Sequence, residues 1–355
     1  MSQSMRVHSV DALRGLTVGA MLVVNDAGNW DHVFPWLEHV AWHGCGLADY
    51  IFPFFLSIVG VSLALALSPE LARGVSAGEL ARPVLLRGLR IVLLGLALHA
   101  FAWWVIPGRG MRPMGVLQRI GICYALAGMA VVYLRATWQW LLCAVLLLGH
   151  GGLLCLGGSM EPHLNLADRL DTWLLGSHAY VFDAASGHAQ EPEGLLSTLG
   201  ALASTLLGVR AGAWLLAGQR GRLWAMGALL LVLGVAGAVP IPMNKQLWTP
   251  TFVLWTSGAA FWLLALAHIL VDRHGWPALG RSMGINAIVV YAGAWVAACL
   301  LAGTGTQTVL YTQLFLPLRP WLGEDGCSLA FALAFTAAGW GLMVWFARKG
   351  WRVSI

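Results

Sequence analysis

The chain of 355 residues is 59% hydrophobic and only 10% charged, and its mean hydropathy is +0.73. Such a chain carries more apolar surface than one water-soluble core can bury, so a soluble globular protein is excluded. Its net charge of +5 follows from membrane topology and not from nucleic-acid binding, as the positions of the basic residues show.

Ten stretches are apolar enough to cross a bilayer as helices, because each has roughly 18 or more residues with few charges. They are 12–30, 47–68, 84–105, 114–134, 138–157, 194–216, 222–240, 249–271, 283–302 and 328–347. Only the connections 158–193 and 303–327 are long, which leaves no room for a separate soluble domain. We therefore expect a single all-α domain over 1–355, a polytopic bundle of about ten transmembrane helices.

Arginine and lysine residues concentrate on one side of these spans. If the N-terminus is cytoplasmic, most of the 21 basic residues fall inside, and the outer ones are Arg109, Arg112, Arg119, Arg169, Lys245 and Arg319. This bias follows the positive-inside rule and predicts that both termini are cytoplasmic. The start "MSQSMRVHS" lacks the pattern of a cleaved signal, so we expect the first span to stay in the membrane.

The outer linker 158–193 contains "LNLADRLDTWLLG". Its leucines and tryptophan recur at helical spacing, which predicts a short helix lying at the membrane interface. The six cysteines include no C-x-x-C pair, so the sequence predicts neither a disulfide framework nor a metal site.

Polar groups inside or beside apolar spans are the functional candidates, because such groups are costly in hydrocarbon. Asn25 and Asp26 interrupt the first span near its outer end, His39 follows in the outer loop, and Asp49 begins the second span. All lie in the outer third of the bilayer, which predicts a shared cavity. The alternative is that Asn25 binds a neighbouring helix and that His39 and His43 are solvated loop residues.

Three further motifs bring polar groups to the spans. Gln118 and Arg119 lie in the outer end of the fourth span, where an arginine needs a carboxylate or an anionic substrate as its partner. Glu193 begins the sixth span, where it either favours the helix N-terminus or binds a ligand. The motif "MNKQLW" brings Asn244, Lys245 and Trp248 to the same outer surface.

The inner side holds a second group of candidates. Arg87 and Arg90 belong to a basic strip at the start of the third span, with Arg14 nearby by topology, and Asn286 lies near the cytoplasmic end of the ninth span. The positive-inside rule explains the strip as well as a phosphate site does.

Six strings occur in one order along nearly the whole chain: "VDALRGLTVGAMLVVN", "HVAWHGCGLADYIFPFF", "GVLQRIGICY", "EPEGLLSTLGALASTLLGVRAG", "MNKQLWTPTFV" and "GINAIVVYAG". In these strings the chain resembles the heparan-α-glucosaminide N-acetyltransferase family of transmembrane acyltransferases, including bacterial members found with N-acetylglucosamine-utilisation genes. The resemblance implies transfer of an acetyl group from cytoplasmic acetyl-CoA to the amine of a terminal glucosamine across the membrane.

The resemblance also implies site residues. The essential histidine of the family falls on His39, and its asparagine falls on Asn25. The family's "NYGGG" reads "NDAGN" here, and its Trp-Asn-Gly reads Trp42-His43-Gly44, so the pocket lining departs from the family pattern. The human enzyme's lumenal domain and extra span have no counterpart in this sequence, so we expect a free amino sugar or a short saccharide as acceptor.

The expected chemistry follows from these roles. A histidine suits removal of an ammonium proton near neutral pH, so His39 is the predicted general base. Asn25 is the predicted donor to the developing oxyanion, whose loss would raise the barrier by roughly 3 kcal/mol. Asp49 or Glu38 orients the imidazole or binds the ammonium. A relay through an acetyl-histidine is the alternative chemistry.

The expected contacts with acetyl-CoA are Arg14, Arg87, Arg90, Gln118, Arg119 and Asn286. The expected contacts with the sugar are Asp49, Glu38, Trp42, Glu193, Asn244, Lys245 and Trp248. The predicted partners are thus coenzyme A, an amino sugar and the lipid of a bacterial inner membrane, with a homodimer as one option.

An amino-sugar transporter is the rival function, because it also explains polar groups among many spans. It predicts accumulation of sugar without acetyl-CoA. The absence of a detectable sequence repeat and the outer position of the histidine argue against it. A purely structural membrane component is less favoured, because it needs no polar groups within its spans.

Overall fold

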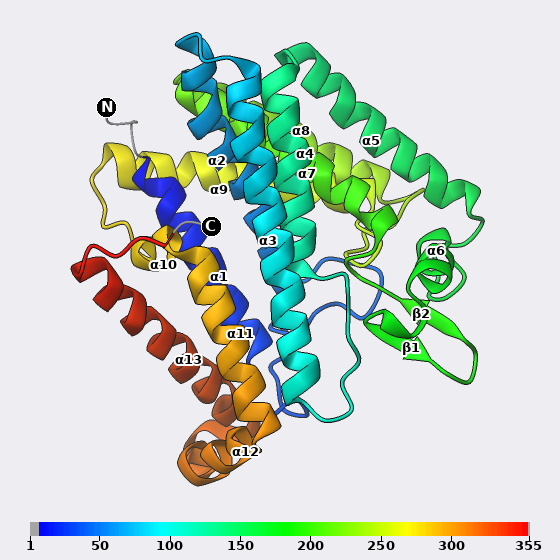
Figure 1. The fold of residues 1–355 in the computed structure, drawn as a ribbon, viewed down its shortest axis with the longest axis vertical. Coiled ribbons are helices and arrows are strands. Elements are labelled where there is room, and N and C mark those ends of the chain that lie inside the picture. Colours follow the sequence, from blue (N-terminus) through cyan, green and yellow to red (C-terminus); the bar gives the residue numbers. More distant parts are fainter. Residues whose placement is uncertain (1–6, 354–355) are drawn as a thin grey trace.

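The computed structural model describes residues 7–353 and is built almost entirely of helices (Figure 1). The helices are α1 (His8–Asn25), α2 (Ile51–Ala72), α3 (Ala77–Val105), α4 (Val116–Tyr133), α5 (Ala136–Leu156), α6 (Leu166–Leu174), α7 (Leu195–Leu216), α8 (Arg220–Gly237), α9 (Pro250–Ala267), α10 (Arg281–Ile285), α11 (Ala287–Gly303), α12 (Thr306–Leu310) and α13 (Arg319–Arg348). One antiparallel hairpin joins β1 (Val181–Asp183) to β2 (His188–Gln190). The predicted all-α fold is confirmed.

Every predicted span falls on a helix. Within residues 7–353, eight helices are long and apolar enough to cross a membrane. The 17-residue α11 is shorter, and α1 is less apolar because it carries Asp11 and Arg14. α13 bends at Gly323, whose φ of 70° lies outside the helical region.

The two described ends of the chain meet at α10. A Cβ on Gly284 of α10 would overlap the Asp11 carbonyl oxygen of α1 at 1.8 Å. Next to α10, Asn286 donates to the Trp351 carbonyl oxygen at 3.3 Å. The start of α1 and the C-terminal segment therefore lie on the same end of the bundle. That this end faces the cytoplasm stays a prediction.

α7 is the centre of the bundle, with 78% of its membrane-length window buried, against 22% for α8. It packs against α2 through two glycines. A Cβ on Gly208 would lie 2.2 Å from the Ser57 carbonyl oxygen, and one on Gly60 would lie 2.0 Å from that of Thr205. Only glycine permits this approach, which stabilises the pair by close backbone packing.

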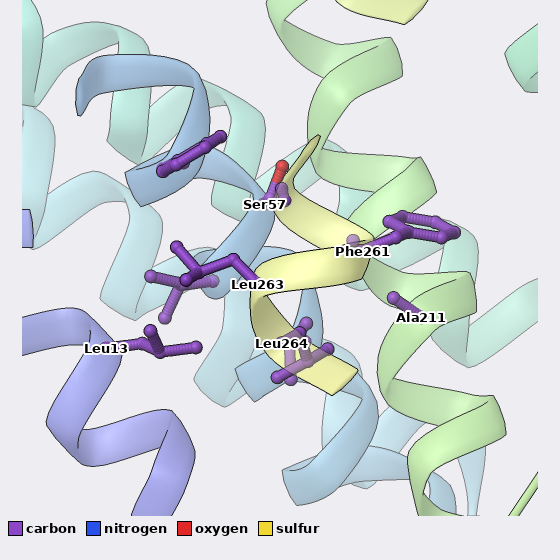
Figure 2. Close-up of a pocket in the computed structure, with 11 residues that line it drawn as sticks. Leu13, Ser57, Ala211, Phe261, Leu263 and Leu264 are labelled. Carbon is purple, nitrogen blue, oxygen red and sulfur yellow. The ribbon is translucent and has the colours of Figure 1, made fainter. Parts of the chain in front are cut away.

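A small apolar cavity lies between α1, α2, α7 and α9 (Figure 2). Its volume of about 20 Å³ is room for about one water molecule. The Ser57 hydroxyl lines it and has no hydrogen-bond partner within the described chain. The cavity is too small for a substrate, so it belongs to the core.

The long connections gather at the end of the bundle opposite α10. The loop after α1 meets the loop before α9 where Gly44 N donates to the Met243 carbonyl oxygen at 2.7 Å. α6 and the hairpin lie together beside the lower ends of the helices in Figure 1. The linker contains the helix α6, and its place at a membrane interface stays a prediction.

Gly208→Ala should destabilise the protein, because its Cβ overlaps the backbone of α2 and overpacking costs about 1–3 kcal/mol. We expect a lower Tm in detergent, measured by intrinsic fluorescence. Gly152→Ala in α5 is the control, because a Cβ there meets nothing within 4 Å. An equal Tm for the two variants would contradict the close α2–α7 contact.

Candidate active site

The imidazole of His39 is held by a buried carboxylate. His39 Nδ1 lies 2.8 Å from Asp49 Oδ1. The other carboxylate oxygen of Asp49 accepts hydrogen bonds from Gly46 N at 2.9 Å and Val40 N at 3.3 Å. The Asp49 side chain is 1% exposed and that of His39 is 42% exposed. The ring is thus anchored on one side and open on the other.

Lys245 completes this cluster from the loop before α9. Its Nζ lies 2.9 Å from His39 Nδ1, 3.0 Å from His39 Nε2 and 3.5 Å from Asp49 Oδ1. An isolated β-bridge between His43 and Asn244 fixes the two loops side by side. The structure therefore brings together a histidine, a carboxylate and an amine that are far apart in the sequence.

Burial lowers the pKa of Lys245, and the nearby Asp49 and Glu193 carboxylates raise it by less, so it lies below the usual range. Nearby cations in turn lower the pKa of Glu193. Burial raises the pKa of Glu193, but Arg112, Arg119 and Lys245 lower it further. The charge of Lys245 in one loop therefore depends on the charge of Glu193 in the other, and the reverse also holds.

Asn244 and Trp248 shape the Lys245 loop. Asn244 Oδ1 accepts from Leu247 N at 2.8 Å, and Asn244 N donates to Thr249 Oγ1 at 3.0 Å. Trp248 takes a left-handed φ of 51° and is 1% exposed. Its Nε1 donates to Ser204 Oγ at 3.1 Å. We predicted sugar contacts for both residues, yet the structure uses their polar atoms to fold the loop.

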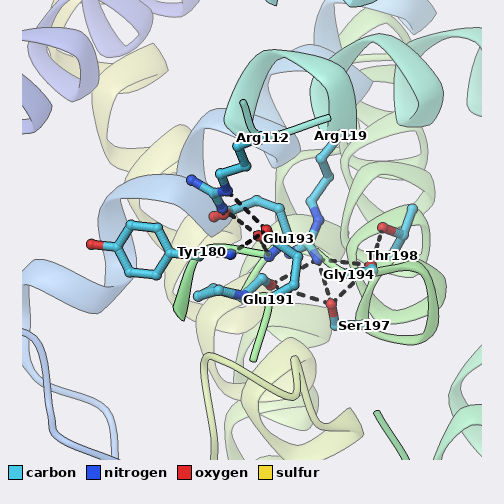
Figure 3. Close-up of polar contacts among 9 residues, drawn as sticks. Arg112, Arg119, Tyr180, Glu191, Glu193, Gly194, Ser197 and Thr198 are labelled. Carbon is cyan, nitrogen blue, oxygen red and sulfur yellow. Dashed lines mark hydrogen bonds and ion pairs between the residues drawn. The ribbon is translucent and has the colours of Figure 1, made fainter. Parts of the chain in front are cut away.

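Two arginines hold the segment before α7 (Figure 3). Arg112 forms ion pairs with both Glu191 and Glu193. Its guanidinium also lies over the Tyr180 ring, 4.6 Å from the centroid. Glu191 in turn accepts from Tyr180 N at 3.0 Å. Glu193 is therefore paired within the protein, at the start of α7 as predicted.

Arg119 reaches the same segment from inside the bundle. It is 0% exposed and donates to the carbonyl oxygens of Pro192 at 2.8 Å and Gly194 at 3.2 Å, and to the Ser197 hydroxyl. Its guanidinium carbon lies 5.1 Å from the centroid of the Trp248 ring. We expected an anion as its partner, but carbonyl oxygens take most of that role. Arg119 thus ties the segment before α7 to the Lys245 loop.

A wall of aromatic residues faces this cluster from α3 and α11. His99 stacks on Trp295 with centroids 5.2 Å apart, and the Arg109 guanidinium lies 5.3 Å from the Trp295 centroid. Tyr291 lies within electrostatic reach of Glu193 and Asp26. These aromatic residues of α3 and α11 were not among the predicted site residues.

Three other predicted residues form no hydrogen bond or ion pair with the imidazole in the described chain. Asn25 is the last residue of α1 and is exposed, and Glu38 is exposed beside His39. Neither side chain has a hydrogen bond or ion pair within the part of the chain that the structure describes. Trp42 Nε1 donates to the Met160 carbonyl oxygen at 2.9 Å, so it holds the outer linker.

Gln118 lies between α4 and α3. It is 1% exposed, and both atoms of its amide lack a partner among residues 7–353. A Cβ on Gly95 would lie 2.4 Å from Gln118 Oε1, so only glycine leaves room for this amide. The structure is compatible with a ligand contact here, which stays a prediction.

The inner candidates fall into two groups. Arg14 donates to Ser62 Oγ at 2.6 Å, and Asn286 binds the backbone of Trp351 and Val353, the latter at 3.0 Å. These two side chains are engaged in packing. Arg87 and Arg90 are exposed, however, and line an open hollow along α3 with the other residues Gly78, Glu79, Arg82, Pro83 and Leu86.

Three guanidinium groups in this hollow have the chemistry to hold phosphate groups, because arginine binds phosphate through paired N–H donors. Arg82, Arg87 and Arg90 recur on one part of α3, and Arg87 also lies over the Tyr124 ring at 5.2 Å. No group of three or more His, Cys, Asp or Glu residues is placed to hold a metal ion between residues 7 and 353.

The chain is similar in sequence to known heparan-alpha-glucosaminide N-acetyltransferases. The sequence model of the family described as "Heparan-alpha-glucosaminide N-acetyltransferase, catalytic" matches residues 6–166. The Homo sapiens protein named heparan-alpha-glucosaminide N-acetyltransferase is 28% identical over 350 residues, which cover 81% of this chain and 52% of the relative. The Mus musculus protein of that name is 27% identical over 356 residues, covering 82% and 54%. The resemblance that the motifs indicated is confirmed, and the chain spans about half the length of these curated relatives.

Lys245 should lose its proton at a lower pH than an ordinary lysine, because burial lowers its pKa more than Asp49 raises it. Labelling with acetic anhydride over a pH series, read by mass spectrometry, is expected to modify Lys245 with a lower midpoint than Lys349, the second lysine of the chain. Asp49→Asn should lower the Lys245 midpoint further, because it removes a negative charge that favours the ammonium. A higher midpoint in this variant would be evidence against the contact.

Proposed function

We propose that this protein is a membrane N-acetyltransferase, which moves acetyl from cytoplasmic acetyl-CoA to the amine of glucosamine, or of a terminal glucosamine, on the outer side of a bacterial inner membrane. The observation that supports it most is the 2.8 Å contact of His39 with the buried Asp49, at the residue where the family resemblance places the essential histidine. A transporter is not favoured by any contact in the site.

His39 acts as the general base. A carboxylate can only accept a hydrogen bond, so Asp49 selects the tautomer that carries its proton on Nδ1. Nε2 is then the basic nitrogen. It takes a proton from the acceptor's ammonium, and the free amine attacks the acetyl carbonyl carbon. When the new C–N bond forms and the C–S bond breaks, the nitrogen loses a second proton, and coenzyme A leaves as a thiolate that takes up this proton.

Two donors serve the oxygen on which negative charge develops. Lys245 Nζ lies 2.9 Å from Nδ1 and 3.0 Å from Nε2 of the ring, and its long, flexible side chain lets it make room for the acceptor amine. Asn25 ends α1 with an exposed amide. A fixed donor in a site of low dielectric stabilises the oxyanion more than water does.

The residues of the inner hollow fit the nucleotide end of acetyl-CoA. Arg87 and Arg90 would hold its phosphates, and Gln118, whose buried amide lacks a partner in the described chain, would meet the pantetheine amides. Acetyl-CoA supplies the thioester. The protein supplies the general base, supplies the hydrogen-bond donors and orients the substrates.

Removal of His39 tests the function directly. Purified protein in detergent is given acetyl-CoA and glucosamine, and free thiol and N-acetylglucosamine are followed together. His39→Ala should lower kcat by about 10²–10⁴-fold, the usual contribution of a general base. His43→Ala is the control, because that ring contacts Asn244 and Glu161 and not Asp49.

The same assay separates the alternatives. Sugar accumulation in vesicles without thiol release would show a carrier and refute the transferase. Thiol release before glucosamine is added, in stoichiometric amount, would indicate the acetyl-histidine route in place of direct transfer.

The two acidic candidates next to His39 should differ in their effect. Asp49→Asn should lower kcat by about 10²-fold with little change in KM, because the ring loses its orientation. Glu38→Gln should stay within about twofold, as for a surface substitution without contacts. Equal losses in the two variants would refute the assignment of Asp49.

A further inference from the structure

Asp26 follows Asn25 directly at the outer end of α1. Its backbone N–H donates to the Leu22 carbonyl oxygen at 3.1 Å, which closes the helix. The next residue is fixed as well, because Gln307 Nε2 donates to the Ala27 carbonyl oxygen at 3.1 Å. The backbone on both sides of Asp26 is therefore held in place, so its carboxylate has a defined position.

This carboxylate is half-buried, and it has neither a hydrogen bond nor an ion pair within residues 7–353. Two buried carboxylates near this end are matched, Asp49 by His39 and Glu193 by Arg112. A partly desolvated carboxylate without a cation is unfavourable. Asp26 thus differs from its neighbours by needing a positive partner that the described chain does not supply.

Its surroundings belong to the candidate active site. Tyr291 interacts electrostatically with both Asp26 and Glu193. Glu193 interacts with Lys245, whose ammonium lies within 3.0 Å of the His39 ring. α11, which carries Tyr291, packs against both α1 and α3. Through Tyr291 and α11, Asp26 therefore adjoins the Glu193 segment of the candidate active site.

We propose that Asp26 binds the ammonium group of the acceptor and makes this site selective for a free amino sugar. The proposal rests on the function proposed above and adds the residue that recognises the substrate's charge. The chain has this carboxylate where the family pattern "NYGGG" has a tyrosine, so the selectivity is a property of this sequence. A single carboxylate without a second acidic ligand suits an organic cation better than a metal ion.

Arg109 is the basic side chain to consider as an internal partner. It interacts electrostatically with the same groups, Tyr291 and Cys299, as Asp26 does. Its guanidinium is stacked on Trp295, however, and forms no ion pair with Asp26 in the part of the chain described. The carboxylate is left available to a ligand.

Equilibrium binding without acetyl-CoA tests this role apart from catalysis. Purified full-length protein in detergent is titrated with glucosamine and, separately, with N-acetylglucosamine, which lacks the charge. Asp26→Asn keeps the shape of the side chain and removes its charge. It should weaken glucosamine binding at least tenfold, about the smallest loss expected when a desolvated charge pair is broken, and leave N-acetylglucosamine binding nearly unchanged.

Asp31→Asn is the matched control, because Asp31 lies in the same loop and is exposed; it should change neither affinity. The proposal is overturned if Asp26→Asn binds glucosamine as tightly as the wild type, if it loses both sugars equally, or if the wild type binds no glucosamine. Wild-type protein that binds glucosamine through Asp26 and yet releases no coenzyme A would instead refute the transferase function alone.

Discussion

The buried carboxylate of Asp49 is the constraint on which the outer end of the protein depends. It stands at the start of α2 with 1% exposure, so its charge must be matched by fixed donors. Two backbone N–H groups, the His39 imidazole and the Lys245 ammonium supply them. Removing one partner from a buried charge pair typically costs about 3–5 kcal/mol. The group that orients the proposed base therefore also folds the loop that carries it.

Arg119, in the interior of the bundle, likewise holds two segments of the site together. Its Nη2 donates to two carbonyl oxygens and a hydroxyl before α7, and the face of the planar guanidinium packs on Trp248. The segment with Glu193 and the loop with Lys245 are thereby fixed relative to each other. A change at Arg119 would disturb both walls of the chamber, although its described contacts do not include the imidazole.

The sequence predicted most of the fold, because a membrane span needs only length and apolar composition. It also predicted that His39 and Asp49 lie at the same depth in the membrane. It could not separate Asp49 from Glu38, since the direction of a side chain in a loop depends on tertiary contacts. For the same reason Asn286 was interpreted as a ligand group, whereas its amide binds the backbone of 351–353. A local sequence pattern does not show which residues from distant parts of the chain a side chain will contact.

One sequence signal for the missed residues did exist. Arg109, Arg112, Arg119 and Lys245 all fall on the predicted outer side, against the positive-inside rule, and the structure holds each of them in local contacts near the candidate active site. Each is offset by a local contact, such as the stacking of Arg109 on Trp295 or the two ion pairs of Arg112. A basic side chain held in this way belongs to a folded site and not to a flexible loop. It therefore has less effect on the orientation of the chain in the membrane than a free lysine or arginine would have. Basic residues on the predicted outer side, next to spans, thus indicate a polar site, and Asp26 is a half-buried acid beside it that has no cation within residues 7–353.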